Sequence, residues 1–288
     1  MGLPPDADIH PTATGRAKEV VDKHSKEQPL KLYSGWFCPF GGPNTRVIVQ
    51  RVWIVLEEKK IPYQYIEVNP YKKPDSLLAL NPRGLVPTLA CPTIRPDGST
   101  AVKPLYESTV INEYLEDAFP NPEQPLHPAD PYQKARGRIW IDYVTSRITP
   151  SFYRFLQYQG EEEGLNKARE EFLGHLKEFI LAMDEIGPFF HGSNFMMPDI
   201  MLAPLAIRFW IIDQFKKGGL GIPAPGEGGN DEVVWNRWRM WLAAVETRES
   251  VASTMSDKEH SMPIYKRYAD DVAQSELAKA TRVGKGVP

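Results

Sequence analysis

The sequence predicts a mixed α/β domain in the first half of the chain, followed by an all-helical bundle. Between residues 29 and 119, short apolar runs typical of strands alternate with longer stretches of helical spacing. Residues 120–131 carry five prolines, which is typical of a linker. Residues 132–268 contain long helical periods without strand alternation. These three observations predict two domains joined by a short connection.

Composition excludes several classes of protein. A length of 288 residues, with 42% hydrophobic and 25% charged residues, is ordinary for a soluble globular chain of two domains. A net charge of −3 gives no basic footprint for nucleic acid or a membrane surface. Two cysteines make no disulfide framework and indicate a reducing, cytoplasmic compartment. No apolar run nears the roughly 18 residues that span a bilayer, and the histidines show no metal-ligand spacing, so we expect no metal.

The first half predicts strands and helices in a definite order. The apolar positions of the first helix, such as Val49, Val52 and Leu56, recur three and four residues apart. This order, βαβ followed by a hairpin and a helix, is the thioredoxin-like α/β arrangement. The elements expected are strand 30–33, helix 45–60, strand 63–68, helix 74–80, strands 84–89 and 100–102 around a turn at 96–99, and helix 107–119.

The second half and the two ends complete the expected organisation. Residues 1–28 are polar and contain prolines, which predicts a flexible arm with a helical turn at 17–24. The polar residues 269–288 predict a flexible tail. The helical stretches expected in the bundle are 131–158, 166–186, 199–215 and 231–251.

Cys38 is the first residue that suggests chemistry. It lies in a loop between an expected strand and an expected helix. A thiol near a helix N-terminus is favoured as the thiolate, which is the nucleophilic form of cysteine. The alternative is a buried inert cysteine. Cys91, beside Pro92 and not in a Cys-x-x-Cys pair, is interpreted as structural.

Three further positions suggest a binding site. The Val86–Pro87 bond before a strand is a candidate cis peptide, against the commoner trans form. Glu107 and Ser108 open a helix, where a hydroxyl and free N–H groups form a natural seat for a carboxylate, or an ordinary cap. Lys73 pairs with a second carboxylate in one interpretation and is a solvated surface lysine in the other.

Together these motifs resemble the glutathione transferases, and the omega-like, cysteine-type class is the nearest match. The resemblance covers about residues 30–215 and rests on motifs in the expected order. They are Phe-Cys-Pro-Phe at 37–40, Asn-Pro-x-Gly-Leu-Val-Pro at 81–87 and Tyr-Glu-Ser at 106–108, with additional support at 50–53 and 113–115.

The resemblance implies a site for glutathione in the first domain and a nucleophilic Cys38. It implies that Phe40 packs near glutathione, that Lys73 meets the glycyl carboxylate, and that the Val86 backbone pairs with the cysteinyl part beside Pro87. Glu107 and Ser108 would hold the γ-glutamyl end. A homodimer is also implied, as is an acceptor pocket in the helical domain. Its candidate residues are Tyr143, Tyr153 and Trp210, each of which is a core residue in the alternative interpretation.

Two segments depart from the family's pattern. Residues 41–48 are inserted after the cysteine motif, where the family usually passes directly into the first helix. In the helical domain the usual Ser/Thr-x-x-Asp capping box has Met196 in the hydroxyl position, while Asp199 is retained.

We expect an enzyme that uses Cys38 for glutathione-dependent thiol transfer, deglutathionylation or reduction of small oxidised acceptors such as dehydroascorbate. One alternative is an enzyme that conjugates glutathione to an electrophile in biosynthesis or detoxification. The other is a non-catalytic glutathione-binding protein of the same fold, disabled by the insert at 41–48. The sequence does not identify the acceptor.

Overall fold

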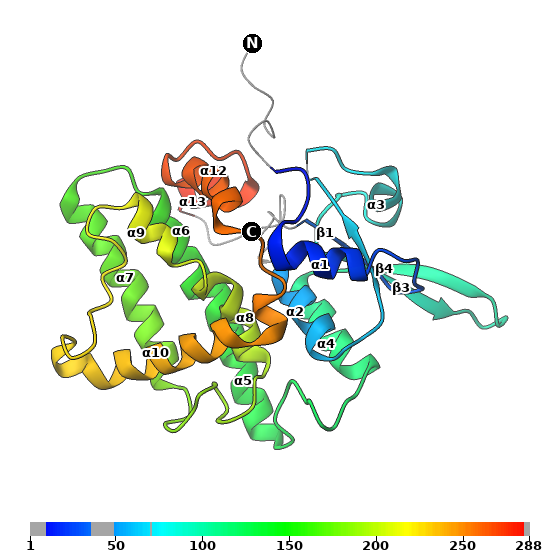
Figure 1. The fold of residues 1–288 in the computed structure, drawn as a ribbon, viewed down its shortest axis with the longest axis horizontal. Helices are drawn as coiled ribbons and strands as arrows, with labels where there is room; N and C mark the ends of the chain where they lie inside the picture. Colours follow the sequence, from blue (N-terminus) through cyan, green and yellow to red (C-terminus); the bar gives the residue numbers. More distant parts are fainter. Residues whose placement is uncertain (1–9, 36–48, 70, 285–288) are drawn as a thin grey trace, which may run out of the picture. The chain divides into compact units, whose positions relative to one another are not determined.

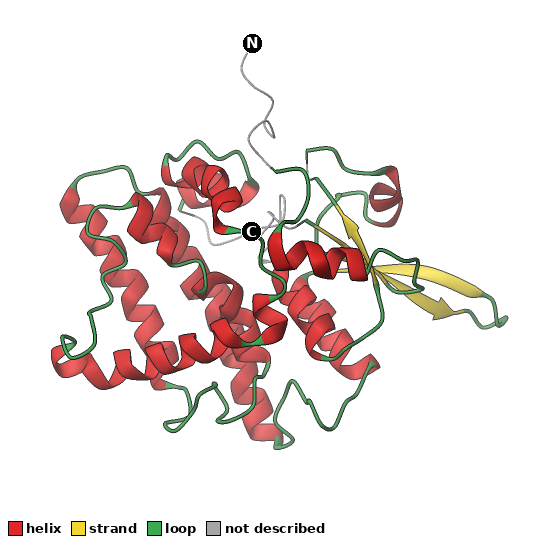
Figure 2. Ribbon diagram, viewed as in Figure 1, coloured by secondary structure: helices red, strands yellow, loops and turns green. Residues whose placement is uncertain are grey.

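The computed structural model describes residues 10–35, 49–69 and 71–284. The chain divides into two compact units, and each is described by itself. The first is formed by the chain up to Gln124 together with Ala252–Ile264, and the second by Pro125–Val251 and Tyr265–Val287. Figure 2 shows the strands in the first unit and a helical second unit. The expected fold class, a thioredoxin-like domain followed by a helical domain, is confirmed.

The first unit contains a four-stranded sheet with the order β2-β1-β3-β4. β1 pairs in parallel with β2 and antiparallel with β3, and β3 pairs antiparallel with β4. The parallel pair requires a crossover, which α2 supplies. The bounds are β1 (Lys31–Ser34), α2 (Gln50–Glu58), β2 (Gln64–Glu67), α3 (Asp75–Leu80), β3 (Thr88–Ile94), β4 (Thr100–Tyr106) and α4 (Ser108–Ala118).

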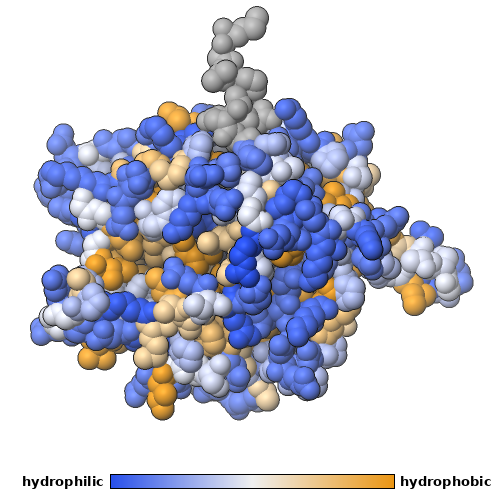
Figure 3. Space-filling model, viewed as in Figure 1, coloured by the Kyte–Doolittle hydropathy of each residue, from blue (hydrophilic) through white to orange (hydrophobic). Residues whose placement is uncertain are grey.

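The β3–β4 hairpin differs from the expectation. The predicted strand 84–89 is wrong over residues 84–87, because Gly84 has a φ of +60° and Val86–Pro87 is a cis bond. β3 also runs beyond residue 89 to Ile94, and β4 runs beyond residue 102 to Tyr106. Pro92 is tolerated since β1 pairs with β3 only as far as Ala90. The hairpin therefore extends beyond the sheet (Figure 1), and hydrophobic surface is visible near its end (Figure 3).

The core of the first unit lies between the sheet and the helices α2 and α4. Almost every residue of α2 is buried, including Val52, Trp53 and Leu56. Trp53 packs on Tyr65 of β2 with ring centroids 4.6 Å apart. α4 contributes the buried residues Ile111 and Leu115. A helix buried on nearly all sides is held by packing rather than by an amphipathic face.

The N-terminal segment differs from the flexible arm expected over residues 1–28. From residue 10 it is described, and α1 (Gly15–Lys23) buries Ala17 and Val20. The amide of Thr14 donates to Ser256 Oγ at 3.1 Å, and the amide of Asp257 donates to Thr14 Oγ1 at 3.0 Å. These contacts join segments far apart in the sequence, so a local pattern does not reveal them.

The second unit is a helical bundle around a chain of aromatic rings. Phe172 and Phe209 have ring centroids 5.1 Å apart, Phe209 stacks on Trp238, and Trp238 stacks on Trp241. The elements from α5 onward are α5 (Pro131–Tyr143), the π-helix η1 (Val144–Ile148), α6 (Thr149–Gln157), α7 (Glu162–Leu181), α8 (Met197–Ala206), α9 (Trp210–Phe215), η2 (Gly229–Asp231), α10 (Glu232–Thr247), α11 (Glu249–Ala252), α12 (Lys258–Ala269) and α13 (Glu276–Arg282). Of these, the end of α11 at Ala252 and the part of α12 up to Ile264 belong to the first unit.

The C-terminal segment also differs from the flexible tail expected over residues 269–288. α13 packs against α6, and Gln157 donates its side-chain amide to the carbonyl of Ala278 at 3.2 Å. The same amide donates to Asp271 at 2.9 Å. The polar composition of the C-terminal segment therefore does not mean that it is flexible, because hydrogen bonds hold it in place. Within residues 10–35, 49–69 and 71–284, no helix has the length and apolarity needed to cross a bilayer.

Candidate functional site

Strand register brings the predicted binding residues to one edge of the sheet. Thr88 at the start of β3 lies opposite Tyr33 near the end of β1 and opposite Tyr106 at the end of β4. Pro87 precedes Thr88 and Glu107 follows Tyr106, so both lie at this edge. These residues belong to separate sequence motifs, and the antiparallel pairing explains why they lie at the same end of the strands.

The loop before β3 is fixed by two buried side chains. Asn81 donates its amide to Thr88 Oγ1 at 3.1 Å and accepts from the Arg83 amide at 3.2 Å. Thr88 Oγ1 donates to the Leu85 carbonyl at 2.6 Å. The loop contains the predicted cis bond between Val86 and Pro87, which is present.

Val86 is the most informative residue of this loop. It is only 2% exposed, yet neither its amide nor its carbonyl has a hydrogen-bond partner in the described part of the chain. Buried backbone groups are almost always paired in native proteins. An extended peptide-like ligand is one kind of group that can pair with such an amide and carbonyl.

Lys73 lies across the same loop because residue 84 is a glycine. A Cβ on Gly84 would come within 2.5 Å of Lys73 Cδ and 3.0 Å of its Nζ, and the φ of +60° already disfavours other residues. Lys73 Nζ donates to the Arg83 carbonyl at 3.3 Å. It has no carboxylate partner among the described residues, so the ammonium is available to an anion.

Glu107 and Ser108 form the start of α4. Glu107 has a φ of 69°, which is uncommon for a residue other than glycine and is typical of a constrained site. Ser108 is fully buried, and its hydroxyl has no hydrogen-bond partner among the described residues. The first amides of a helix are also unpaired and carry partial positive charge. A carboxylate seat at this helix start stays a prediction.

Two polar residues at this edge were not singled out in the sequence. Asn112, one helical turn after Ser108, is fully buried and both atoms of its amide lack partners in the described structure. Ser34, the last residue of β1, is also buried with an unpaired hydroxyl. Asn112 follows Ser108 by four residues, which places it on the same face of the helix. This spacing could have predicted Asn112 as a further candidate site residue.

The structure describes Cys91 but not Cys38. Cys38 and Phe40 lie outside the described residues. Cys91 is buried, and burial raises the pKa of its thiol to about 11, with a hydrogen bond to Tyr114 opposing that rise. A thiol with such a pKa is protonated near neutral pH, in agreement with a structural role.

The predicted acceptor residues lie in three different environments of the second unit. Tyr153 is fully buried and packs on Tyr268, with ring centroids 5.5 Å apart. Tyr143 donates its hydroxyl to Glu178 and lies 2.8 Å from His175 Nδ1. Trp210 begins α9 and is half-buried. An acceptor role for these residues stays a prediction. The described residues contain no group of three or more metal-binding side chains.

Comparison with known proteins identifies the family of the chain. The N-terminal domain model of the glutathione S-transferases matches residues 47–118, and the C-terminal domain model matches residues 166–244. Glutathione S-transferase U1 of Arabidopsis thaliana is 32% identical over 224 residues, which cover 77% of this chain and 87% of the plant protein. The chain belongs to the glutathione S-transferase family.

Two omega-class proteins confirm the resemblance of this transferase to that class. Glutathione S-transferase omega-1 of Sus scrofa is 30% identical over 177 residues, which cover 61% of this chain and 65% of the pig protein. The crystal structure of glutathione transferase Omega 3C from Trametes versicolor has a TM-score of 0.73 and 40% identity, covering 91% of this chain and all of that one. The N-terminal match begins at residue 47, which lies after Cys38 and near the end of the inserted segment.

Proposed function

We propose that the protein is a glutathione-dependent thiol transferase that binds glutathione at this edge of the sheet and uses Cys38 as its nucleophile. The unpaired backbone of buried Val86 carries the proposal, because an amide and a carbonyl side by side match the cysteinyl residue of a tripeptide. Lys73 on one side and Ser108 on the other provide partners for its two carboxylates. Family membership supports glutathione as the co-substrate.

The position of Cys38 in the chain supports its role. It follows Gly35 by three residues, which span at most about 11 Å of chain. β1 ends at the edge where Val86 and Ser108 lie. In this proposal Phe40 contributes apolar surface beside glutathione, and Glu107 contributes to the γ-glutamyl seat.

The proposed reaction is two successive thiol–disulfide exchanges. The Cys38 thiolate attacks the glutathione sulfur of a mixed disulfide, forms an S–S bond to it and releases the acceptor as a thiolate that takes up a proton. A second glutathione thiolate then attacks this enzyme disulfide. Oxidised glutathione leaves, and Cys38 is regenerated as the thiolate.

Conjugation of glutathione to an electrophile is the second candidate function. It is supported by the match to the Arabidopsis protein, which is named as a glutathione S-transferase and not as one of the omega class. In that case a hydroxyl at the site, such as Ser34, holds the glutathione thiolate and Cys38 is not needed. Conjugation that survives a Cys38→Ala change, without disulfide exchange, favours this candidate.

We propose that the protein forms a homodimer and that it is located in the cytoplasm. Three large apolar side chains are exposed on β4 and α4. Their exposed fractions are 51% for Val102, 43% for Tyr106 and 51% for Val110. Apolar side chains on an edge strand and the following helix are typical of a surface that a second copy covers. The acceptor is a small disulfide or electrophile, and the helical domain is the proposed source of its pocket.

Ser108→Ala tests the glutathione site without disturbing the fold. The Ser108 hydroxyl has no described protein partner, so its removal should leave the free energy of unfolding unchanged or slightly raised. A lost hydrogen bond to a carboxylate should raise the Kd of glutathione about tenfold. Isothermal titration of the variant and of Thr109→Ala, the next position on α4, makes the comparison.

Lys73→Ala should weaken glutathione binding by a similar factor, while Lys103→Ala on exposed β4 should not. An unchanged Kd in both Ser108→Ala and Lys73→Ala contradicts the proposed binding site, whatever the activity of the enzyme.

A further inference from the structure

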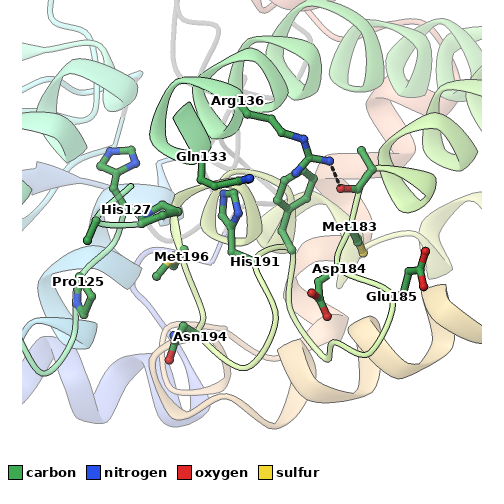
Figure 4. Close-up of a pocket in the computed structure, with 14 residues that line it drawn as sticks. Pro125, His127, Gln133, Arg136, Met183, Asp184, Glu185, His191, Asn194 and Met196 are labelled. Carbon is green, nitrogen blue, oxygen red and sulfur yellow. Dashed lines mark hydrogen bonds between the residues drawn. The ribbon is translucent and has the colours of Figure 1, made fainter. Parts of the chain in front are cut away.

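A second candidate binding site lies entirely within the helical unit. A pocket of about 660 Å³ is lined by the start of α5, by the connection before it and by the loop between α7 and α8 (Figure 4). This volume lies in the range of small-molecule sites. None of the residues proposed for glutathione binding or for the acceptor lines it.

The loop that forms one wall of the pocket is held rigidly. Buried Asp199 accepts from the amides of Phe190 and Met196, at 2.8 and 3.0 Å. Arg237 donates to the carbonyls of Asp184, Pro188 and Phe189, each within 2.9 Å. A wall fixed in this way does not have to become ordered when a ligand binds, which favours affinity.

Arg136 is the charged group that dominates the opposite wall. Its guanidinium lies 5.4 Å from the ring centroid of Phe190 and donates to the Ala182 carbonyl, as the dashed line in Figure 4 shows. No carboxylate pairs with it within the described structure. Asp184 also lines the pocket, but its Oδ1 accepts from the amides of Ile186 and Gly187, at 3.0 and 2.8 Å, and it forms no ion pair with Arg136. The cation therefore faces the pocket without a counter-ion.

Neutral polar groups surround this cation. The side-chain amides of Gln133 and Asn194 have no hydrogen-bond partner in the part of the chain that the structure describes, and neither does Nε2 of His191. Figure 4 shows Gln133 and Arg136 extending from α5 toward the loop. Met183, Phe190 and Met196 add apolar surface to the same lining.

We propose that this pocket binds a small carboxylate with an apolar body, with Arg136 as the partner of the carboxylate. A guanidinium presents a planar fork that matches a carboxylate in two-point contact. The apolar lining accommodates a ring or alkyl group. A carboxylate fits better than a doubly charged phosphate, because Asp184 and Glu185 also line the pocket and one guanidinium neutralises only one charge.

Calorimetric titration of the full-length protein with benzoate and with benzamide tests the proposal. Benzamide has the same shape without the charge, so we expect benzoate to bind about tenfold more tightly. Arg136→Gln should lower the benzoate affinity about tenfold and leave benzamide unchanged. Gln133→Ala should lower the benzoate affinity by a smaller factor. The Gln133 side chain makes no hydrogen bond within the described structure, so the free energy of unfolding of this variant should stay close to that of the wild type. Glu185→Gln is the matched control and should not weaken benzoate binding.

Three results would overturn the proposal. The first is that benzoate does not bind at concentrations up to about 10 mM. The second is that Arg136→Gln and Gln133→Ala both bind benzoate as tightly as the wild type does. The third is that inorganic phosphate binds more tightly than benzoate.

The ring of His191 reports on occupancy of the pocket. Burial lowers the pKa of His191 to about 4, and Arg136 and His127 add to the lowering while Asp184 opposes it. The imidazole is therefore neutral at pH 7, and a carboxylate bound beside it should raise this pKa. Because bound benzoate then favours the protonated ring, benzoate affinity should increase as the pH falls from 7 to 5. A His191 titration curve, measured by NMR, that is the same with and without saturating benzoate contradicts the placement.

Discussion

Replacement of Cys38 by serine is expected to lower the rate of glutathione-dependent disulfide exchange at least about 1,000-fold, because a hydroxyl is protonated at neutral pH and forms no disulfide. Reduction of 2-hydroxyethyl disulfide by glutathione is a suitable assay. The Kd of glutathione should change little, since its proposed partners Lys73, Val86 and Ser108 are retained. A loss of turnover with binding preserved is the signature of a nucleophile.

Cys91→Ala is the matched control for this experiment. Cys91 is buried, and its raised pKa keeps the thiol protonated, so the variant should exchange disulfides at the wild-type rate. Retention of full disulfide exchange in Cys38→Ser contradicts the proposed function. If Cys38→Ser is inactive and the wild type is inactive as well, the non-catalytic alternative is favoured, and deletion of residues 41–48 then tests whether the insert is the cause.

Asp199→Ala should give the largest loss of stability, with a decrease of about 4 kcal/mol in the free energy of unfolding of the helical domain. The fully buried carboxylate accepts from the Trp241 indole at 2.7 Å as well as from the Phe190 and Met196 amides. Alanine leaves all three donors buried without an acceptor. Burial raises the pKa of Asp199 to about 6, so urea denaturation at pH 7.5, followed by tryptophan fluorescence, measures the ionised form.

Asp130→Ala is the exposed counterpart. Asp130 caps α5 by accepting from the Gln133 amide at 2.8 Å, and its loss should cost only about 1 kcal/mol. Asp199→Asn keeps one carbonyl oxygen as an acceptor and should fall between the two. A cost for Asp199→Ala no greater than for Asp130→Ala contradicts a central role for Asp199 in holding the 184–196 loop.

Much of the first domain could be predicted from the sequence, because residue spacing and short motifs indicate its elements. Apolar spacing located α2, and the motif at 81–87 located the cis bond that the structure contains. The strand predicted at 84–89 was wrong over residues 84–87, because apolar residues fill the loop before β3 and are buried there without forming a strand. Buried Val86 looks like a strand residue in the sequence, although its backbone pairs with no strand.

Features that depend on contacts between distant segments could not be predicted. The helical turn predicted at 17–24 overlaps α1, but the contacts that fix α1 and α13 were not predicted. Hydrogen bonds such as those of Thr14 with Ser256 and of Gln157 with Ala278 hold these regions in place. The pocket at Arg136 was missed for the same reason. Whether an arginine has a carboxylate partner is decided by its three-dimensional surroundings, and the sequence around Arg136 does not differ from an ordinary helix surface.

The pKa of the Cys38 thiol tests the central claim most directly. The Cys91→Ala variant contains a single cysteine, so the pH dependence of its alkylation by iodoacetamide reports on Cys38 alone. The proposed function predicts a pKa well below the usual value of about 8.5, with glutathione protecting the thiol from alkylation. A pKa at or above about 8.5, with no protection by glutathione, would contradict it.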